Sequence, residues 1–392
     1  MERVVIVGAG ASGRGHVGEL AFEGGYRIAF LDSDRALCEL LARSGSYDVR
    51  LVSAHPRTVT VRDYEIHHTG RIDALYPAFA AASLLLTTVG ADNVKDAASE
   101  LRPLFVRWLR EGGGSELKNV LCCENMNRSS TVFRRHLEEG FPRDLLAELD
   151  RRVGFPDTMI ARVVARPRDP LRLLGEEYSE WTADRLALRG AVLPSVRTLE
   201  LVERQERYLQ RKLYIHNTGH ATFGYLGFLK GYRYMHEAAL DPEIMAVCES
   251  AIEESGWGIE REHGFAPEVI AAYRRALTDK CVLPELPDEL ERVVRDPIRK
   301  LGPEERFFGP IGLMRRHGRE PRSLLYGVAA ALASRIPGDA QSAAIERSLA
   351  TEGLRGALRL CGSAVPEPVA TAIEALLPEV RERFRPIPGR PR

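Results

Sequence analysis

The sequence has no excess of charge of either sign, because 55 Lys and Arg residues balance 55 Asp and Glu residues. A neutral chain has no general attraction for nucleic acid or an anionic membrane, so any anion must be bound by a local cluster. No apolar run approaches the roughly 18 residues that a membrane-spanning helix requires. The opening segment, MERVVIVGAG, lacks the basic and apolar regions of a secretory signal. We therefore expect neither nucleic acid nor a membrane as a partner.

Cysteine is scarce as well. Six cysteines are scattered along 392 positions, and no two of them are spaced as CxxC. This pattern argues against a structural zinc site and against a disulfide framework. Free thiols suit a reducing compartment, so we expect a cytoplasmic protein.

The chain is long for a single hydrophobic core and suits two packed domains. Residues 1–190 alternate between short apolar runs and helical patterns, which predicts an α/β, doubly wound, Rossmann-like domain. Residues 191–384 read as consecutive helices, which predicts a mostly α-helical C-terminal domain. The Pro-rich, basic residues 385–392 are expected to form a disordered tail.

Within the first domain, four compact apolar runs predict buried parallel strands, and a helix is expected between two of them. Alternating residues at 51–68 predict a hairpin that interrupts the pattern. The predicted strands are residues 3–7, 27–32, 83–89 and 120–123, and the helix is 93–110.

The segment GAGASG at 8–13 fits GxGxxG, directly after a predicted strand and before a helical pattern. In such a loop Gly8 permits the tight turn, Gly10 lets the backbone approach a pyrophosphate, and Gly13 lets the helix lie close to the strand. The helix N-terminus offers free N–H groups to the phosphates, with Ala11 and Ser12 beside them. A glycine-rich turn without a cofactor and an FAD site are the alternatives.

The second predicted strand ends at Asp32, 19 residues beyond Gly13. An acidic residue at this place accepts hydrogen bonds from the adenosine ribose and repels the 2′-phosphate of NADP, which favours NAD. We expect Thr88, Val89 and Gly90, at the end of a later strand, to contribute to the same cofactor site.

The segment 211–227 places three polar groups on one side of an expected helix at about 100° per residue: Lys212, Asn217 and His220. Gly224 and Gly227 project into the same arc, which indicates that something comes close to that face. A partly desolvated lysine can act as a base toward an alcohol, while an amide can hold the oxygen. A solvated helix face is the alternative.

His216 and His220 are also spaced i, i+4, as a pair of metal ligands could be. No third ligand is evident near them. We therefore expect no metal.

Five segments resemble the mannitol-1-phosphate 5-dehydrogenase branch of the polyol-specific long-chain dehydrogenases, in the order and spacing of that family. The pattern Lys-x4-Asn-x2-His is particularly specific to it. The segments are GAGASGRGHVG (8–18), NVLCCENMNR (119–128), EEYSEWTAD (176–184), KLYIHNTGHATFGYLG (212–227) and RDPIRKLGPEER (295–306).

The resemblance implies an NAD-binding Rossmann domain, a helical substrate domain and no metal. It matches Lys212 to the family's general base, Asn125 and Asn217 to its oxyanion-holding asparagines, and His220 to its orienting histidine. Asn125 follows the apolar run 120–123, at the strand end where α/β proteins bind ligands, although Asn is also common in turns. The chain departs from the family at several positions near the cofactor and at His216, where the family prefers an uncharged residue.

The segment 295–300 concentrates three cations in six residues: Arg295, Arg299 and Lys300. If the segment is helical, the two arginines share a face. Guanidinium groups suit a phosphate because they form paired hydrogen bonds with it. The alternative is a solvated surface whose charges are paired with Asp296, Glu304 and Glu305.

These observations predict reversible oxidation of a hexitol phosphate, mannitol 1-phosphate, to fructose 6-phosphate with NAD. An unphosphorylated polyol or a hexuronate is the second hypothesis, and a non-catalytic sensor of NAD or sugar phosphate is the third. A monomer or a small homo-oligomer suits each of them.

Overall fold

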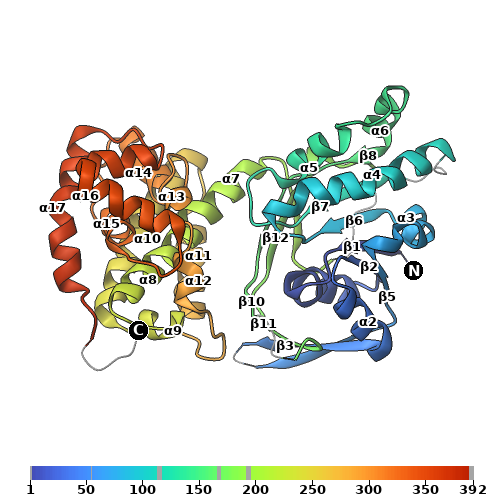
Figure 1. Ribbon diagram of the computed structural model, residues 1–392, viewed down its shortest axis with the longest axis horizontal. Helices are drawn as coiled ribbons and strands as arrows, with labels where there is room; N and C mark the ends of the chain where they lie inside the picture. Colours follow the sequence, from blue (N-terminus) through green and yellow to red (C-terminus); the bar gives the residue numbers. More distant parts are fainter. Residues whose placement is uncertain (1, 54, 113–116, 166–168, 191–195, 388–392) are drawn as a thin grey trace. The chain divides into compact units, whose positions relative to one another are not determined.

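The computed structural model describes residues 2–53, 55–112, 117–165, 169–190 and 196–387. The chain forms two compact units, Met1–Leu209 and Gln210–Arg392 (Figure 1). The boundary lies after the predicted residue 190 because β13 (Leu199–Val202) still pairs with a strand of the first unit. Part of the predicted tail is held, since the Ile387 N–H donates to the Lys230 carbonyl at 3.1 Å. Its remainder, 388–392, lies outside the described residues.

The first unit is organised by a six-stranded parallel sheet in the order β5-β2-β1-β6-β7-β8. Numbered within the sheet, this is the order 3-2-1-4-5-6 of dinucleotide-binding folds, so the predicted Rossmann-like class is confirmed. The strands are β1 (Arg3–Val7), β2 (Arg27–Asp32), β5 (Glu65–His68), β6 (Leu84–Thr87), β7 (Lys118–Cys122) and β8 (Val153–Gly154).

Alternate side chains of these strands enter two separate cores, one on each face of the sheet. Val5 of β1 joins a core with α3, α4, α5 and α6, while Ile6 joins a core with α1 and α2. Burial on both faces explains why the strands are apolar throughout. The helices are α1 (Glu19–Glu23), α2 (Arg35–Ser44), α3 (Tyr76–Ala81), α4 (Val94–Arg110), α5 (Ser129–Glu138) and α6 (Leu146–Arg152).

Two smaller sheets complete the first unit. One has the order β10-β11-β3-β4 and the other β13-β12-β9. A hairpin is present, but it begins earlier than the predicted 51–68: β3 pairs with β4, and β5 returns from the hairpin to the main sheet. The strands are β3 (Ser46–Val52), β4 (Arg57–Arg62), β9 (Thr158–Ala161), β10 (Val164–Ala165), β11 (Arg172–Glu176) and β12 (Glu180–Asp184).

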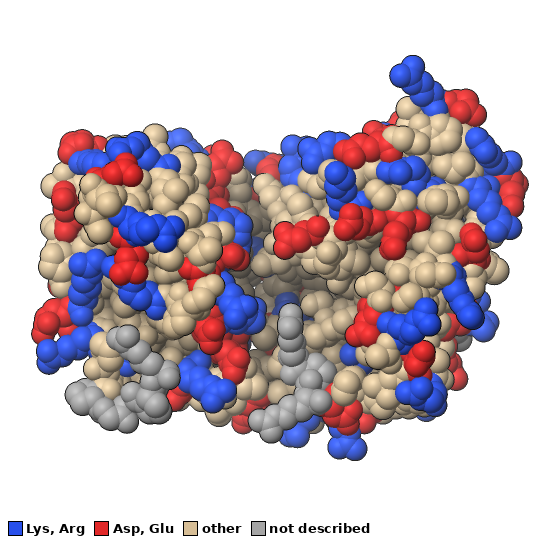
Figure 2. All heavy atoms as spheres, in the orientation of Figure 1, with Lys and Arg blue, Asp and Glu red and all other residues tan. Residues whose placement is uncertain are grey.

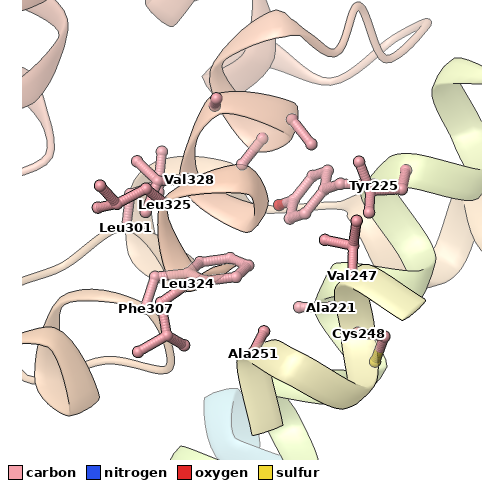
Figure 3. Packing of buried hydrophobic residues seen from close by; sticks show 14 of the residues in the cluster. Ala221, Tyr225, Val247, Cys248, Ala251, Leu301, Phe307, Leu324, Leu325 and Val328 are labelled. Atoms are coloured by element: carbon pink, nitrogen blue, oxygen red, sulfur yellow. The ribbon is translucent and has the colours of Figure 1, made fainter. Parts of the chain in front are cut away.

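The second unit is helical in its described residues, as predicted. Its centre is α8, which is buried on nearly every side and packs against α9, α10, α12 and α15. Figure 3 shows Phe307 and Tyr225 among the residues of this core. The helices are α8 (Asn217–Leu229), α9 (Met235–Ala239), α10 (Pro242–His263), α11 (Pro267–Cys281), α12 (Leu290–Val294), α13 (Pro297–Lys300), α14 (Phe308–Arg316), α15 (Ser323–Ala333), α16 (Ala340–Leu360) and α17 (Glu367–Arg383); α7 (Gln205–Arg211) spans the boundary.

The surface of each unit carries both signs of charge. On the face shown in Figure 2, basic and acidic side chains are interspersed, as the balanced composition predicts. All six cysteines are buried. Across the described residues, the helices are too short or too polar to cross a bilayer.

Candidate active site

The glycine loop leaves β1 and continues into a π-helical turn, η1 (Gly13–Gly18). Gly8 has φ 97°, a left-handed conformation that favours glycine. A Cβ at Gly13 would lie 1.9 Å from the Gly8 carbonyl oxygen, so the turn closes only with glycine there. A Cβ at Gly10 would have no described atom within 4 Å. The loop is therefore tight at both ends and open in the middle, where a pyrophosphate approaches the backbone.

Asp32 lies at the end of β2 and bonds to the glycine loop. Its carboxylate accepts hydrogen bonds from the Ala9 N–H at 2.5 Å and from the Asp34 N–H at 2.8 Å. Asp34 in turn caps the N-terminus of α2 by accepting from the Leu37 N–H. The acidic group is thus fixed at the carboxyl end of the sheet, beside the open part of the loop.

The segment Thr88, Val89 and Gly90 follows β6, the strand beside β1 in the sheet. The Thr88 hydroxyl donates to the Gly8 carbonyl at 2.8 Å, which ties the two loops together. Buried Glu124 accepts from the Val89 N–H at 3.0 Å and from the Thr87 hydroxyl at 2.8 Å.

Burial raises the pKa of Glu124. The hydrogen bonds that it accepts work in the opposite direction but do not offset the effect of burial. Glu124 stands inside the NVLCCENMNR segment, directly before Asn125, yet sequence reasoning did not assign it a role. A carboxyl that follows a buried strand could have signalled one. Asn125 itself is exposed just beyond β7, at the same edge of the sheet as the glycine loop.

In the second unit, Lys212 begins a π-helical turn, η6 (Lys212–His216), that leads into α8. The turn closes where the Asn217 N–H donates to the Lys212 carbonyl, five residues back, so the backbone connects the two predicted catalytic residues directly. The widened turn is supported from outside by the buried Ser255 hydroxyl, which donates to the Tyr214 carbonyl. The regular helix expected from residue 211 is therefore wider in this turn. Such turns are frequent at functional sites.

His220 is held by a carboxylate. Its Nε2 lies 2.8 Å from Asp288 Oδ2, and the Arg292 guanidinium bonds the other oxygen of Asp288. Burial works to raise the pKa of Asp288, but hydrogen bonding to His220 and the Arg292 charge hold it well below its usual value. Burial also lowers the pKa of His220, although the Asp288 carboxylate works to raise it. A neutral His220 that donates from Nε2 leaves Nδ1 as an acceptor for a substrate hydroxyl.

Sequence reasoning missed Asp288. It lies in an acidic, Pro-rich segment, and no spacing distinguishes it from Glu285, Glu289 or Glu291.

His216 also lies on this helix. Its ring stacks on His220 with centroids 6.1 Å apart, and its Nε2 contacts the Lys280 ammonium. Within the described residues, no group of three or more His, Cys, Asp and Glu side chains is arranged to hold a metal ion.

The glycines of α8 do have close neighbours, as predicted, but these are other helices. A Cβ at Gly224 would lie 2.6 Å from Val293 of α12, and one at Gly227 would lie 2.5 Å from Ala238 of α9. These glycines therefore let α8 pack closely in the core of the second unit.

Arg295 and Arg299 do not share the face of one helix, as they would if the segment 295–300 were helical throughout. The chain breaks at Asp296, whose φ is 58°, so Arg295 ends α12 and Arg299 belongs to α13. The two arginines are about half exposed and lie 3.6–3.7 Å from carboxylates of Glu291, Asp296 and Glu305.

Lys300 was expected to bind a phosphate together with the two arginines. It is buried instead, so this expectation is wrong. Its Nζ donates to the Val293 carbonyl at 2.5 Å and to the Arg295 carbonyl, where it satisfies the C-terminal end of α12. Burial, with the charges of Arg306 and Arg299, lowers the pKa of Lys300 to about 7.

The first unit thus presents a dinucleotide loop with Asn125 at the same sheet edge, and the second groups Lys212, Asn217 and His220 on one helix. Together these are the parts that a dehydrogenase needs: a place for a nucleotide, and an acid–base group with polar groups for an alcohol oxygen.

The sequence places this dehydrogenase in a family. Residues 2–193 match the mannitol dehydrogenase Rossmann domain, and residues 205–358 match the mannitol dehydrogenase C-terminal domain. The chain belongs to the mannitol dehydrogenase family, so the predicted family is confirmed.

Solved structures share the fold. Mannitol 2-dehydrogenase from Pseudomonas fluorescens, in a ternary complex with NAD and D-mannitol, is 17% identical with a TM-score of 0.71, covering 96% of this chain and 94% of that chain. A substrate-free D-sorbitol dehydrogenase is 15% identical with a TM-score of 0.80, covering 97% and 93%.

Proposed function

We propose that this family member is an NAD-dependent dehydrogenase that interconverts a hexitol phosphate, mannitol 1-phosphate, and fructose 6-phosphate. The observation that carries the proposal is the helix with Lys212, Asn217 and carboxylate-held His220, in a chain whose first unit has an open glycine loop. The cofactor is inferred from this loop and Asp32, and the Pseudomonas fluorescens relative was solved with NAD.

In the oxidative direction, Lys212 takes the proton of the substrate hydroxyl as a general base. Asn125 and Asn217 donate hydrogen bonds to the oxygen as it becomes a carbonyl, and these bonds strengthen as negative charge develops. His220 orients the hydroxyl, and Asp288 holds the ring of His220. Held by the glycine loop and Asp32, NAD would supply the acceptor for the hydride that leaves the carbinol carbon.

A preference for NAD over NADP is expected because Asp32 repels a 2′-phosphate. Arg35, three residues further on, could contact that phosphate and limit the preference. Comparing kcat/KM for NAD and NADP tests the preference for NAD. Asp32→Ala should reduce the ratio of the two kcat/KM values. Equal or better use of NADP by the unmutated enzyme would overturn it.

For the substrate phosphate we propose Arg295 and Arg299, which are half exposed and present guanidinium groups outside the core. An unphosphorylated polyol is the second candidate, because the Pseudomonas fluorescens relative was solved with D-mannitol. The two candidates differ in what the arginines contribute to substrate binding.

Arg299→Ala is therefore expected to raise KM for fructose 6-phosphate far more than KM for fructose. A charge-assisted hydrogen bond of about 1.5–3 kcal/mol corresponds to a loss of about ten- to 150-fold. Arg315→Ala is the matched control, because Arg315 is also paired with an exposed carboxylate, Glu320, in the second unit. Equal losses on both substrates would mean that Arg299 has a structural role.

Steady-state NADH oxidation with fructose 6-phosphate, fructose, fructuronate and tagaturonate tests the proposed function as a whole. We expect the highest kcat/KM with fructose 6-phosphate. A preference for an unphosphorylated ketose would support the second candidate, and a hexuronate preference would reassign the substrate class. NADH binding without turnover of any ketose would support a sensor.

A further inference from the structure

His216 is a polar residue at the site that the proposed reaction does not use. It ends the π-helical turn, four residues after Lys212 and directly before Asn217. Its ring lies between two other polar groups: one face stacks on His220, and Nε2 contacts the ammonium group of Lys280 from α11.

The contact with Lys280 fixes where the His216 ring carries its proton. An ammonium group can only donate, so Nε2 must accept and carries no hydrogen. Burial, together with the neighbouring Lys280 charge, lowers the pKa of His216 well below its ordinary value, so the ring is neutral. A neutral imidazole without a proton on Nε2 has its proton on Nδ1.

That Nδ1–H group is a buried donor that lacks a hydrogen-bond acceptor among the described residues. It is shielded from solvent and forms no hydrogen bond to any described residue in this conformation. The Asn217 side chain is nevertheless close enough to raise the pKa of the ring. A buried donor without an acceptor is unfavourable, so an acceptor is expected in the working enzyme.

Asn217 needs such a donor. An amide has an oxygen and a nitrogen of nearly the same shape, and only its NH₂ group can donate to the oxygen of the substrate. A hydrogen bond to Oδ1 from a donor that cannot reverse its role would keep the amide in the productive orientation.

We propose that Lys280 holds His216 in the Nδ1–H form, and that Nδ1–H donates to Asn217 Oδ1 so that the Asn217 NH₂ faces the reacting oxygen. His216 is then a positioning residue, and Lys280 sets its proton. This inference rests on the proposed role of Asn217 in the reaction.

The position of the proton is measured directly by ¹⁵N NMR of the full-length protein with labelled histidine, without substrate. The chain has 10 histidines, and the His216 signal is identified by its loss in His216→Asn. We expect a neutral ring with its proton on Nδ1, and a mixture of both neutral forms in Lys280→Met. A charged ring, a proton on Nε2, or no change in Lys280→Met would overturn the proposal.

Two substitutions then separate positioning from mere packing. Asparagine places an amide nitrogen close to the position of histidine Nδ1, whereas leucine fills similar space without a donor. With the ketose that the unmutated enzyme prefers, we expect His216→Leu to lower kcat on the order of ten- to hundredfold, somewhat less than removal of a donor to the oxyanion costs. His216→Asn should stay within about threefold, and KM for NADH should not change in either variant.

Equal losses in His216→Leu and His216→Asn, or no loss in His216→Leu, would overturn the positioning role. If His216→Leu fails to fold, His216→Gln replaces it, because glutamine puts its amide nitrogen near the Nε2 position and should lose activity. An unmutated enzyme that turns over no ketose refutes the proposed function instead, and the NMR measurement still decides whether Lys280 fixes the ring.

Discussion

Lys212→Ala is expected to lower kcat on the order of 10²–10⁴-fold while the protein still binds NADH, because general-base catalysis contributes rate enhancements of that size. The side chain begins the π-helical turn on the helical unit, and the nucleotide loop is on the other unit. Truncating Lys212 changes none of the residues of the glycine loop or Asp32, so NADH binding should persist. Steady-state kinetics and a fluorescence titration with NADH measure the two effects separately.

Rescue by a free amine distinguishes a lost base from a disturbed turn. Small primary amines should partly restore the rate of Lys212→Ala, with a dependence on the concentration of unprotonated amine. Lys95→Ala, an exposed lysine at the start of α4, is the control that amines should not affect. Near-normal kcat in Lys212→Ala would refute the assignment of the base.

The second large effect is expected from substitutions in the glycine loop. One of them should lower the stability of the protein, and the other should weaken NADH binding. Gly13→Ala should lower the free energy of unfolding by more than the about 1–3 kcal/mol of an ordinary overpacked core. The added Cβ would lie 1.9 Å from the Gly8 carbonyl oxygen, a backbone atom that cannot turn away.

Gly10→Ala should leave the free energy of unfolding within about 0.5 kcal/mol, because no described atom lies within 4 Å of the added Cβ. It should weaken NADH binding instead. Loss of one hydrogen bond to a charged phosphate, about 1.5–3 kcal/mol, corresponds to about ten- to 150-fold in Kd. Chemical denaturation of both variants measures the free energy of unfolding, and NADH titration measures the Kd. Unchanged affinity in Gly10→Ala would place the dinucleotide elsewhere.

The fold could be predicted largely from sequence because its strands are buried on both faces. Such strands appear as short, continuous apolar runs, and β1 and β2 begin and end at the predicted residues. The domain boundary could not be placed in the same way. β13 is a short strand within a region that otherwise reads as helical, and only its pairing with β12 assigns it to the first unit.

The candidate site was predictable where its residues follow a local spacing, as Lys212, Asn217 and His220 do. The groups that support these residues come from distant segments: Asp288 reaches His220 from 68 positions away, and Lys280 reaches His216 from 64. No periodicity of the sequence encodes such contacts.

For the cations at 295–300, the sequence suggested a cluster that the structure does not form. Its composition favoured a shared phosphate surface, but the backbone turns at Asp296 and directs Lys300 inward to cap α12. A run of cations in sequence fixes the number of charges in a segment, whereas the direction of each side chain depends on tertiary packing.

Transfer of deuterium tests the central claim most directly. When the enzyme reduces fructose 6-phosphate with NADH deuterated at nicotinamide C4, the hexitol phosphate should carry one deuterium, bound to the carbon that was the ketose carbonyl. Mass spectrometry and NMR of the product detect it, and Lys212→Ala should form this product far more slowly. A reduced product without deuterium, or no reduced product from any ketose of the panel, would contradict the account of this chain as a hydride-transferring polyol dehydrogenase.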